Sequence, residues 1–221
     1  MDFTRLNQFL TALKANNNKP WFDENRSEYQ AIRNEWLDFV AQVLSNLQAV
    51  HPSLEQLAPN KCIFRINKDI RFSKDKSPYK TNFGMQINFK NKKDLFCGYY
   101  LHIEPQNSFL AGGVYMPPNQ ILAAIRQEID YNADAFLNII ENKALMTVFG
   151  NMQGEKLIKA PKGYEPNNPM LDYLKHKSFI FQKPIPINLL KDSNQFQTQL
   201  IKDLRVLDPF IQFLLPAMEN L

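Results

Sequence analysis

The sequence predicts an α+β fold, with a single domain over residues 1–221, a mainly antiparallel sheet, and helices packed on one face of that sheet. Three observations support this fold class. Apolar residues recur at helical spacing up to residue 50, alternate with polar ones between residues 83 and 104, and return to helical spacing after Pro117-Pro118. Short turns between consecutive strands are typical of antiparallel hairpins, and separate blocks of helices and strands are typical of α+β folds.

The N-terminal region predicts two helices. The first spans residues 3–15, where apolar residues lie at helical spacing. The second is long. It opens near Pro20, which suits the first turn of a helix, and ends before His51-Pro52. One side of this helix carries a stripe of apolar residues, which indicates packing on a core: Phe22, Tyr29, Trp36, Val43 and Val50.

The middle of the chain predicts the sheet. Residues 62–66 carry apolar side chains on both faces of an extended chain, which is typical of an interior strand. Residues 83–89 and 97–104 alternate apolar with other side chains and predict two half-buried strands, joined by a turn at residues 91–94. A third strand is expected over residues 108–115.

The region after residue 117 predicts mainly helices. Two apolar faces at helical spacing lie between residues 121 and 140. Residues 145–159 predict a hairpin, residues 170–176 a short helix, and residues 178–183 a strand. A helix over residues 196–207 is expected to stop before Asp208-Pro209, which suits the N-cap and first position of a separate last turn.

The composition bounds the class of protein. A hydrophobic fraction of 44% suffices for one sizeable core, and no Gly/Ser-rich linker divides the chain. Only two cysteines are present, which favours reduced thiols in the cytoplasm over a disulfide framework. The N-terminus lacks a signal-peptide pattern and no apolar run is long enough to span a membrane, so we expect no membrane partner. The sequence leaves the oligomeric state open.

The positive charge of the protein is concentrated in residues 65–80, which we call the basic loop. This segment holds six basic and two acidic residues, and the resulting net charge of +4 equals that of the whole chain. Phe72 and Tyr79 lie inside the charged run, where large apolar side chains give a loop a defined shape. The pattern therefore favours a site for an anionic ligand over a merely solvated loop.

A polar patch is expected beside the basic loop. The positions of the two predicted strands that point away from the core hold Gln86, Asn88, Tyr100, His102 and Glu104. If the strands pair, these side chains share one face, and the basic loop can fold over it. His102 is then a candidate general acid or base tuned by Glu104 or Tyr100, so His102 and Glu104 are the candidate catalytic residues.

The loop and the patch together predict a cationic pocket. Arginine suits bidentate contact with a phosphate or carboxylate, and lysine supplies a point charge. The candidate ligand-binding residues are Arg65, Arg71, Lys76, Tyr79, Lys80, Tyr100 and Arg126. We expect this pocket to bind a phosphate- or carboxylate-bearing small molecule or a nucleotide, and the sequence leaves open whether a reaction follows.

Other interpretations are open at this point. Nucleic-acid binding is one, with Phe72 and Tyr79 available to stack on bases. Docking of an acidic partner protein is another. In the plainest interpretation, Asp69 and Asp75 pair with the cations of the loop, and the sheet face is simply solvated.

Other site types leave no pattern in the sequence. The histidines and cysteines have no metal-ligand spacing, and His176 is expected at an exposed helix end. No phosphate-binding glycine loop or nucleophile elbow is present either. We therefore expect no metal and no cofactor.

The basic loop also resembles a family signature. Residues 65–81 read R-I-N-K-D-I-R-F-S-K-D-K-S-P-Y-K-T and resemble the R-I-x-R-D-x-R-F-S-x-D-K-x-P-Y-K-T pattern of a domain of unknown function, family number two-four-six-one. Similarity to the family continues at residues 99–103, at Gly112-Gly113 and at Ile125-Arg126, so it covers nearly the whole chain. Lys68 stands where the family pattern usually has arginine. The lysine keeps the positive charge but cannot make the bidentate contacts of a guanidinium group. The resemblance implies one fold unit and brings no established activity, substrate or catalytic residue.

Overall fold

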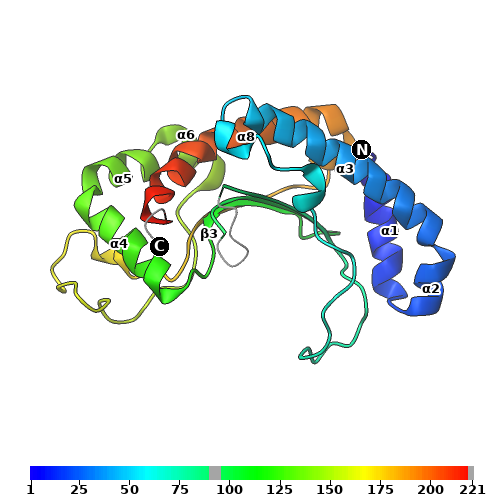
Figure 1. Ribbon diagram of the computed structural model, residues 1–221, viewed down its shortest axis with the longest axis horizontal. Helices are drawn as coiled ribbons and strands as arrows, with labels where there is room; N and C mark the ends of the chain where they lie inside the picture. Colours follow the sequence, from blue (N-terminus) through cyan, green and yellow to red (C-terminus); the bar gives the residue numbers. More distant parts are fainter. Residues whose placement is uncertain (90–95, 219–221) are drawn as a thin grey trace. The chain divides into compact units, whose positions relative to one another are not determined.

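The computed structural model describes residues 1–89 and 96–218. It confirms the α+β fold class, with a four-stranded antiparallel sheet and helices before the first strand, between the third and fourth strands, and after the last (Figure 1). The strands lie side by side in the order in which they occur in the sequence. Their bounds are β1 Phe83–Asn88, β2 Gly98–Ile103, β3 Phe109–Val114 and β4 Phe179–Pro184.

The α-helices of the described residues are α1 Phe3–Ala15, α2 Lys19–Glu24, α3 Arg26–Gln48, α4 Asn119–Tyr131, α5 Ala133–Ile140, α6 Lys143–Phe149, α7 Leu171–Leu174 and α8 Ser193–Leu214. The single long helix predicted after Pro20 is in fact α2 followed by α3. The two are separated at Asn25, whose side-chain Nδ2 donates a hydrogen bond to the Trp21 carbonyl at 2.9 Å. The Asn25 backbone amide donates to the same carbonyl at 3.1 Å, so Asn25 is the C-cap of α2 and also the N-cap of α3.

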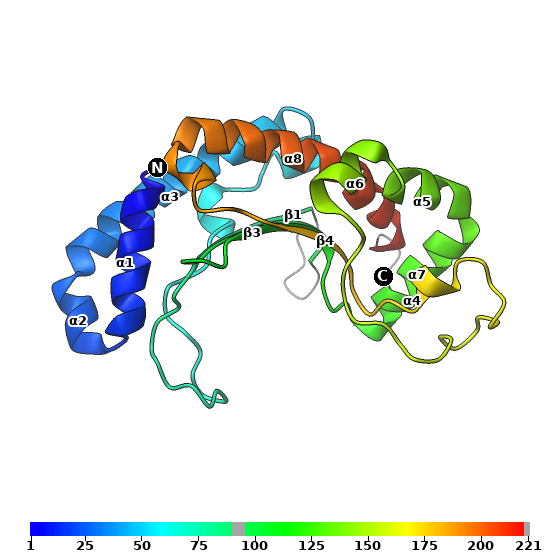
Figure 2. The same ribbon diagram turned by 180° about the vertical axis from the view of Figure 1, so that it is seen from behind.

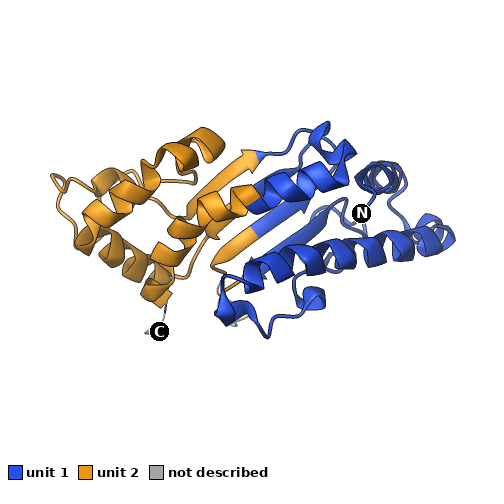
Figure 3. Ribbon diagram, turned by 90° about the horizontal axis from the view of Figure 1, so that it is seen from above, with its two compact units in different colours: residues 1–87, 100–110, 184–201 blue, residues 88–99, 111–183, 202–221 orange. Residues whose placement is uncertain are grey.

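The chain forms two compact units, which are coloured separately in Figure 3. The first unit holds residues 1–87, 100–110 and 184–201, and the second holds residues 88–99, 111–183 and 202–221. The assignment of residues 1–221 to one domain stays a prediction.

In the first unit, helices cover the apolar side of the strands. Trp36 of α3 meets Phe83 of β1 edge-on, with ring centroids 5.9 Å apart. Phe3 of α1 makes edge contacts with Phe39 of α3 at 5.2 Å and with Phe196 of α8 at 5.0 Å. The predicted alternation is confirmed, because the strand positions on this side are all buried: Phe83, Met85, Ile87, Leu101 and Ile103.

In the second unit, the C-terminal half of α8 packs on β3 and β4. Phe210 meets Phe181 edge-on at 4.8 Å. Gly112 is required where Leu207 approaches β3, because a Cβ atom at this position would lie 2.3 Å from the Leu207 Cδ2 atom. The helix runs through Pro209, so the predicted stop before Asp208-Pro209 is wrong. Burial of the apolar residues on both sides of Pro209 outweighs the loss of one helical hydrogen bond.

Two further predictions are wrong. Residues 145–149 belong to the helix α6 and not to a hairpin, because the Asn142 side chain caps the helix by accepting hydrogen bonds from the amides of Ala144 and Leu145. Residues 62–66 are not an interior strand, since only Ile63 forms an isolated bridge with Met85, at the outer side of β1. The turn predicted at residues 91–94 lies outside the described residues.

Candidate functional site

The basic loop belongs to the first unit and consists of two arms that pair with each other. Asn67 and Tyr79 form an antiparallel bridge, and the amides of Lys68 and Lys80 donate to the carbonyls of Pro78 and Ile66 at 2.9 and 2.8 Å. Both views show the arms running away from the sheet (Figure 1 and Figure 2). The backbone bonds pair one arm with the other, and of the segment 67–82 that was expected to fold over the polar face, Thr81 and Asn82 contact it through Glu104 and His102.

The base of the loop, residues 77–80, is anchored through Tyr79. The Tyr79 ring is 6% exposed and stacks on Phe22 of α2 with centroids 4.0 Å apart. The Asn17 side chain donates to the Tyr79 carbonyl at 2.9 Å and accepts from its amide at 3.1 Å. The sequence predicts that Tyr79 binds a ligand or stacks on a base. In the structure its ring packs on Phe22 and anchors the loop.

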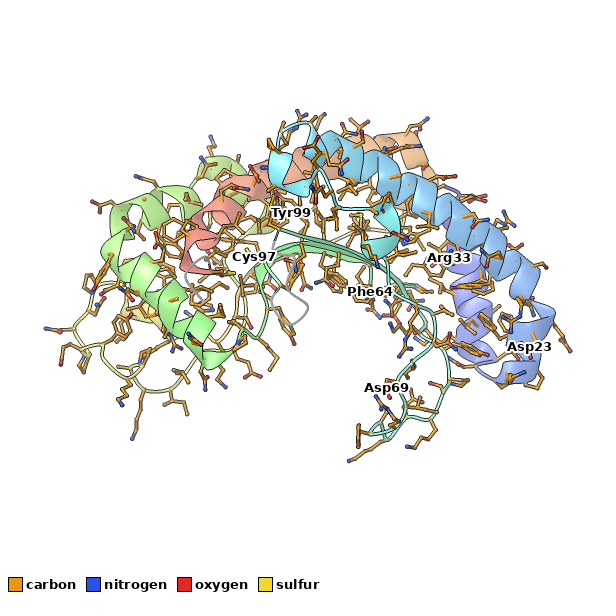
Figure 4. All side chains as sticks on the ribbon, in the orientation of Figure 1. Asp23, Arg33, Phe64, Asp69, Cys97 and Tyr99 are labelled. Carbon is orange, nitrogen blue, oxygen red and sulfur yellow. The ribbon has the colours of Figure 1, made fainter. Side chains whose placement is uncertain are left out.

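At the tip of the loop, residues 69–76, Arg71 and Lys76 find acceptors within the loop itself. The Arg71 guanidinium donates to both carboxylate oxygens of Asp69, at 2.6 and 2.9 Å, and this pairing lowers the pKa of Asp69. Lys76 Nζ donates to the Ile70 carbonyl at 2.9 Å. Figure 4 shows Asp69 far along the loop from Phe64. Arg71 and Lys76, two predicted ligand-binding residues, therefore hold the loop itself.

A set of hydrogen bonds around Asp75, which we call the clasp, joins the tip to the arms of the loop. Lys68 Nζ lies 2.5 Å from a carboxylate oxygen of Asp75 and 3.1 Å from the Ser77 hydroxyl. The Ser77 amide and hydroxyl also donate to the Asp75 carboxylate. Lys68 first, and then these Ser77 donors, hold the pKa of Asp75 well below its usual range.

The polar alternates of β2 form a hydrogen-bonded cluster on the side of the sheet opposite α3. The Tyr100 hydroxyl lies 2.9 Å from His102 Nδ1, and His102 Nε2 lies 3.4 Å from a Glu104 carboxylate oxygen. The Thr81 hydroxyl donates to the other oxygen of Glu104 at 3.0 Å, and Asn82 Nδ2 lies 3.5 Å from His102 Nδ1. The structure thus brings together Tyr100, His102 and Glu104 as the strand period predicted.

The neighbours of His102 assign the roles of its two ring nitrogens. A carboxylate only accepts hydrogen bonds, so Nε2 is the nitrogen that donates toward Glu104. The Tyr100 hydroxyl and the Asn82 amide both donate, so Nδ1 accepts. Burial raises the pKa of Tyr100, and the Glu104 charge adds to this effect, which keeps the hydroxyl protonated.

A pocket of about 450 Å³ lies beside the base of the loop. Its lining consists of Lys14, Asn17, Lys68, Asp75, Ser77, Tyr79, Lys80, Thr81 and Asn82. Burial lowers the pKa of Lys80, and the nearby positive charge of Arg65 lowers it further. Among the described residues, Lys80 has no carboxylate partner. Thr81 and Asn82 connect this pocket to the cluster, because they contact Glu104 and His102.

Several residues that line the pocket or contact the His102 cluster are not among the candidates predicted from the sequence. Thr81 is the last residue of the family signature and Asn82 follows it, so their position at the end of the signature was the available signal. Phe109 stacks on His102 with centroids 4.8 Å apart. Its strand shows no alternation that could have placed it, because every residue of β3 after Phe109 is buried. Lys14 and Asn17 belong to the N-terminal region, and nothing in the sequence connects them with residues 65–82.

Arg126 and His176 belong to the second unit. The Arg126 guanidinium donates to the carbonyls of Leu174 and His176 at 2.7 and 3.2 Å, so its partners are backbone atoms of this unit. His176 is 3% exposed, so the expectation of an exposed helix end is wrong. Burial, followed by the Lys156 charge, lowers the pKa of His176 to about 4.

Two further findings concern metal ions and membranes. No cluster of three or more His, Cys, Asp or Glu side chains that could hold a metal ion occurs in residues 1–89 and 96–218. Within the same residues, no helix has the length and apolar character needed to cross a membrane.

Residues 5–213 match the family described as "Conserved hypothetical protein (DUF2461)". Comparison with curated proteins and with solved structures finds no match. The family match spans the basic loop, the His102 cluster and both compact units. It also agrees with the resemblance seen in residues 65–81. The chain belongs to the DUF2461 family of conserved hypothetical proteins.

Proposed function

We propose that the pocket beside the base of the loop binds a phosphate- or carboxylate-bearing small molecule. The observation that carries this proposal is Lys80. Its ammonium is half-buried, its pKa is lowered, and no carboxylate among the described residues compensates it. An uncompensated, partly desolvated cation in a pocket is favourable only if an anion or water offsets its charge. A bound anion therefore relieves an electrostatic cost that the fold otherwise carries.

The rest of the lining supports an anionic ligand. Three lysines, Lys14, Lys68 and Lys80, face the pocket against the single carboxylate of Asp75. That carboxylate is already engaged by Lys68 and by Ser77. Amide and hydroxyl donors complete the lining, and such groups fix the orientation of a phosphate or carboxylate.

The His102 cluster supplies the groups for proton transfer to or from such a ligand. Glu104 orients His102 through Nε2, and Thr81 holds Glu104 from the side of the pocket. An imidazole oriented by a carboxylate is a common general acid or base. Because Nε2 donates to Glu104, an enzymatic version of the proposal uses Nδ1 of His102 as the proton acceptor, after a ligand group has replaced the 3.5 Å contact of Asn82 at this nitrogen.

Calorimetric titration with inorganic pyrophosphate tests the binding proposal. We expect Lys80→Met to weaken pyrophosphate binding by about tenfold or more, because one charge-assisted contact is lost. The matched control is Lys74→Met, which removes an exposed lysine at the tip and should leave the affinity unchanged. Lys80→Met should not lower the melting temperature, because the lowered pKa shows that the fold disfavours the charged form. Equal affinity in wild type and Lys80→Met, or no binding at all, contradicts the proposal.

Nucleic-acid binding is a second candidate function, and it rests on Phe72. Phe72 is 95% exposed at the tip, and the Arg71 guanidinium lies 5.9 Å from its ring centroid. Tyr79 is buried and does not contribute a free ring. If this candidate is right, a single-stranded oligonucleotide binds with a steep salt dependence, and Phe72→Ala weakens binding. A flat salt dependence rules it out. Docking of an acidic partner protein stays a prediction.

A further inference from the structure

The side of the sheet that carries His102 also presents aromatic rings. Phe64 is 44% exposed, and its ring meets Tyr100 edge-on with centroids 6.1 Å apart. Tyr100 in turn lies 5.7 Å from Phe109. We call these three residues the aromatic platform. A partly exposed phenylalanine on a strand-like segment leaves apolar ring surface in contact with water.

The sequence makes room for the platform at Gly84. A Cβ atom at this position would lie 2.9 Å from Phe64 Cδ2 and 3.3 Å from Tyr100 Cε2. Any larger residue would therefore displace the rings from the surface of β1 and β2. The glycine allows Phe64 to lie against the sheet, where Tyr100 fixes it.

The platform and the pocket share one cation. Lys80 lines the pocket, and its Nζ atom lies 5.1 Å from the centroid of the Phe64 ring. A ligand whose anionic group contacts Lys80 is thus close to the Phe64 ring. Asn82 lies at the same junction, because it lines the pocket and contacts His102 of the cluster. The hydrogen-bonding edge of a planar ring bound there would lie near the Asn82 amide and the His102 imidazole.

We propose that the ligand of this site is a nucleotide, with its phosphates in the lysine-lined pocket and its base on the aromatic platform. This inference rests on the proposed anion-binding function and adds the chemistry of the rest of the ligand. A heteroaromatic base stacks on an aromatic side chain, and its polar edge needs hydrogen-bonding groups nearby. A compact phosphate or carboxylate uses the pocket alone and gains nothing from Phe64.

The test compares pyrophosphate with adenosine diphosphate and uridine diphosphate by calorimetric titration. We expect the nucleotides to bind wild type at least about tenfold more tightly than pyrophosphate. Phe64→Leu keeps an apolar side chain and removes the ring, so it should weaken nucleotide binding about tenfold and leave pyrophosphate binding unchanged. Lys80→Met should weaken both. Phe72→Leu, the same change at an exposed ring of the tip, is the control and should alter neither affinity.

The outcomes separate this inference from the function on which it rests. If pyrophosphate binds and depends on Lys80 but nucleotides bind no more tightly, the anion site stands and the nucleotide assignment is overturned. The nucleotide assignment also fails if nucleotides bind more tightly but Phe64→Leu leaves their affinity unchanged. If Lys80→Met affects neither ligand, the anion site itself is wrong. Circular dichroism of each variant shows whether an affinity loss comes with unfolding.

Discussion

At the tip of the basic loop Arg71 and Lys76 face acceptors from the loop itself, whereas at its base Lys80 faces a pocket. Arg71 is paired with Asp69, and Lys76 is bonded to a backbone carbonyl. Lys80 has no carboxylate partner among the described residues, and its pKa is lowered. The same residue types thus stabilise the loop in one place and form a candidate site in the other. A net charge cannot distinguish these roles, since the positions of the carboxylates decide them.

The two aromatic residues of the loop differ in the same way. Tyr79 at the base is 6% exposed and stacks on Phe22, while Phe72 at the tip is 95% exposed. Within the first unit, the base is continuous with the core, and the tip meets mainly solvent. Replacement of the Tyr79 ring should therefore affect stability, whereas replacement of the Phe72 ring should not.

Replacement of the two rings gives the largest expected difference in stability. Tyr79→Ala should lower the free energy of unfolding by about 3 kcal/mol, because it removes a buried, stacked ring and leaves a cavity. Phe72→Ala should change it by no more than about 0.5 kcal/mol, since the ring is almost fully solvated. Urea unfolding followed by tryptophan fluorescence measures both values. Similar losses for the two variants would show that the tip is as closely packed as the base.

A smaller effect is expected from the clasp at Asp75, and it depends on pH. The folded-state pKa of Asp75 lies below its unfolded value, so the carboxylate stabilises the protein at neutral pH. This contribution is lost as the pH falls from about 4 through the folded-state pKa. Asp75→Asn should therefore lower the melting temperature slightly at pH 7, and by less at pH 3. A difference that persists or grows at pH 3 would show that the charge of Asp75 is not what holds the clasp.

Much of the sheet could be predicted because its strands follow a simple period. Alternation in residues 83–89 and 97–104 placed Tyr100, His102 and Glu104 on one face, and the structure brings them into one cluster. The prediction failed where local signals compete with burial. Pro209 is a strong stop signal for a helix, yet α8 continues through it because both flanking segments are buried. Residues 62–66 have the composition of a strand, but only one of them bridges to β1.

The lining of the pocket depended on contacts between distant parts of the chain. Asn17 and Tyr79 are sixty-two positions apart, and the Asn17 side chain fixes the Tyr79 backbone through two hydrogen bonds. Sequence periods describe one element at a time, so they carry no information about such a pair. For the same reason the sequence did not connect Lys14 of α1 with Lys80.

The sequence alone determined the α+β class, the family, the concentration of positive charge in residues 65–80 and the shared face of Tyr100, His102 and Glu104. Each of these follows from composition, a short motif or a strand period. The tertiary structure decided that Arg71 and Lys76 have acceptors within the loop, whereas Lys80 lines a pocket and has no carboxylate partner among the described residues. That division depends on distances of a few ångströms between side chains, and only the packed chain defines them.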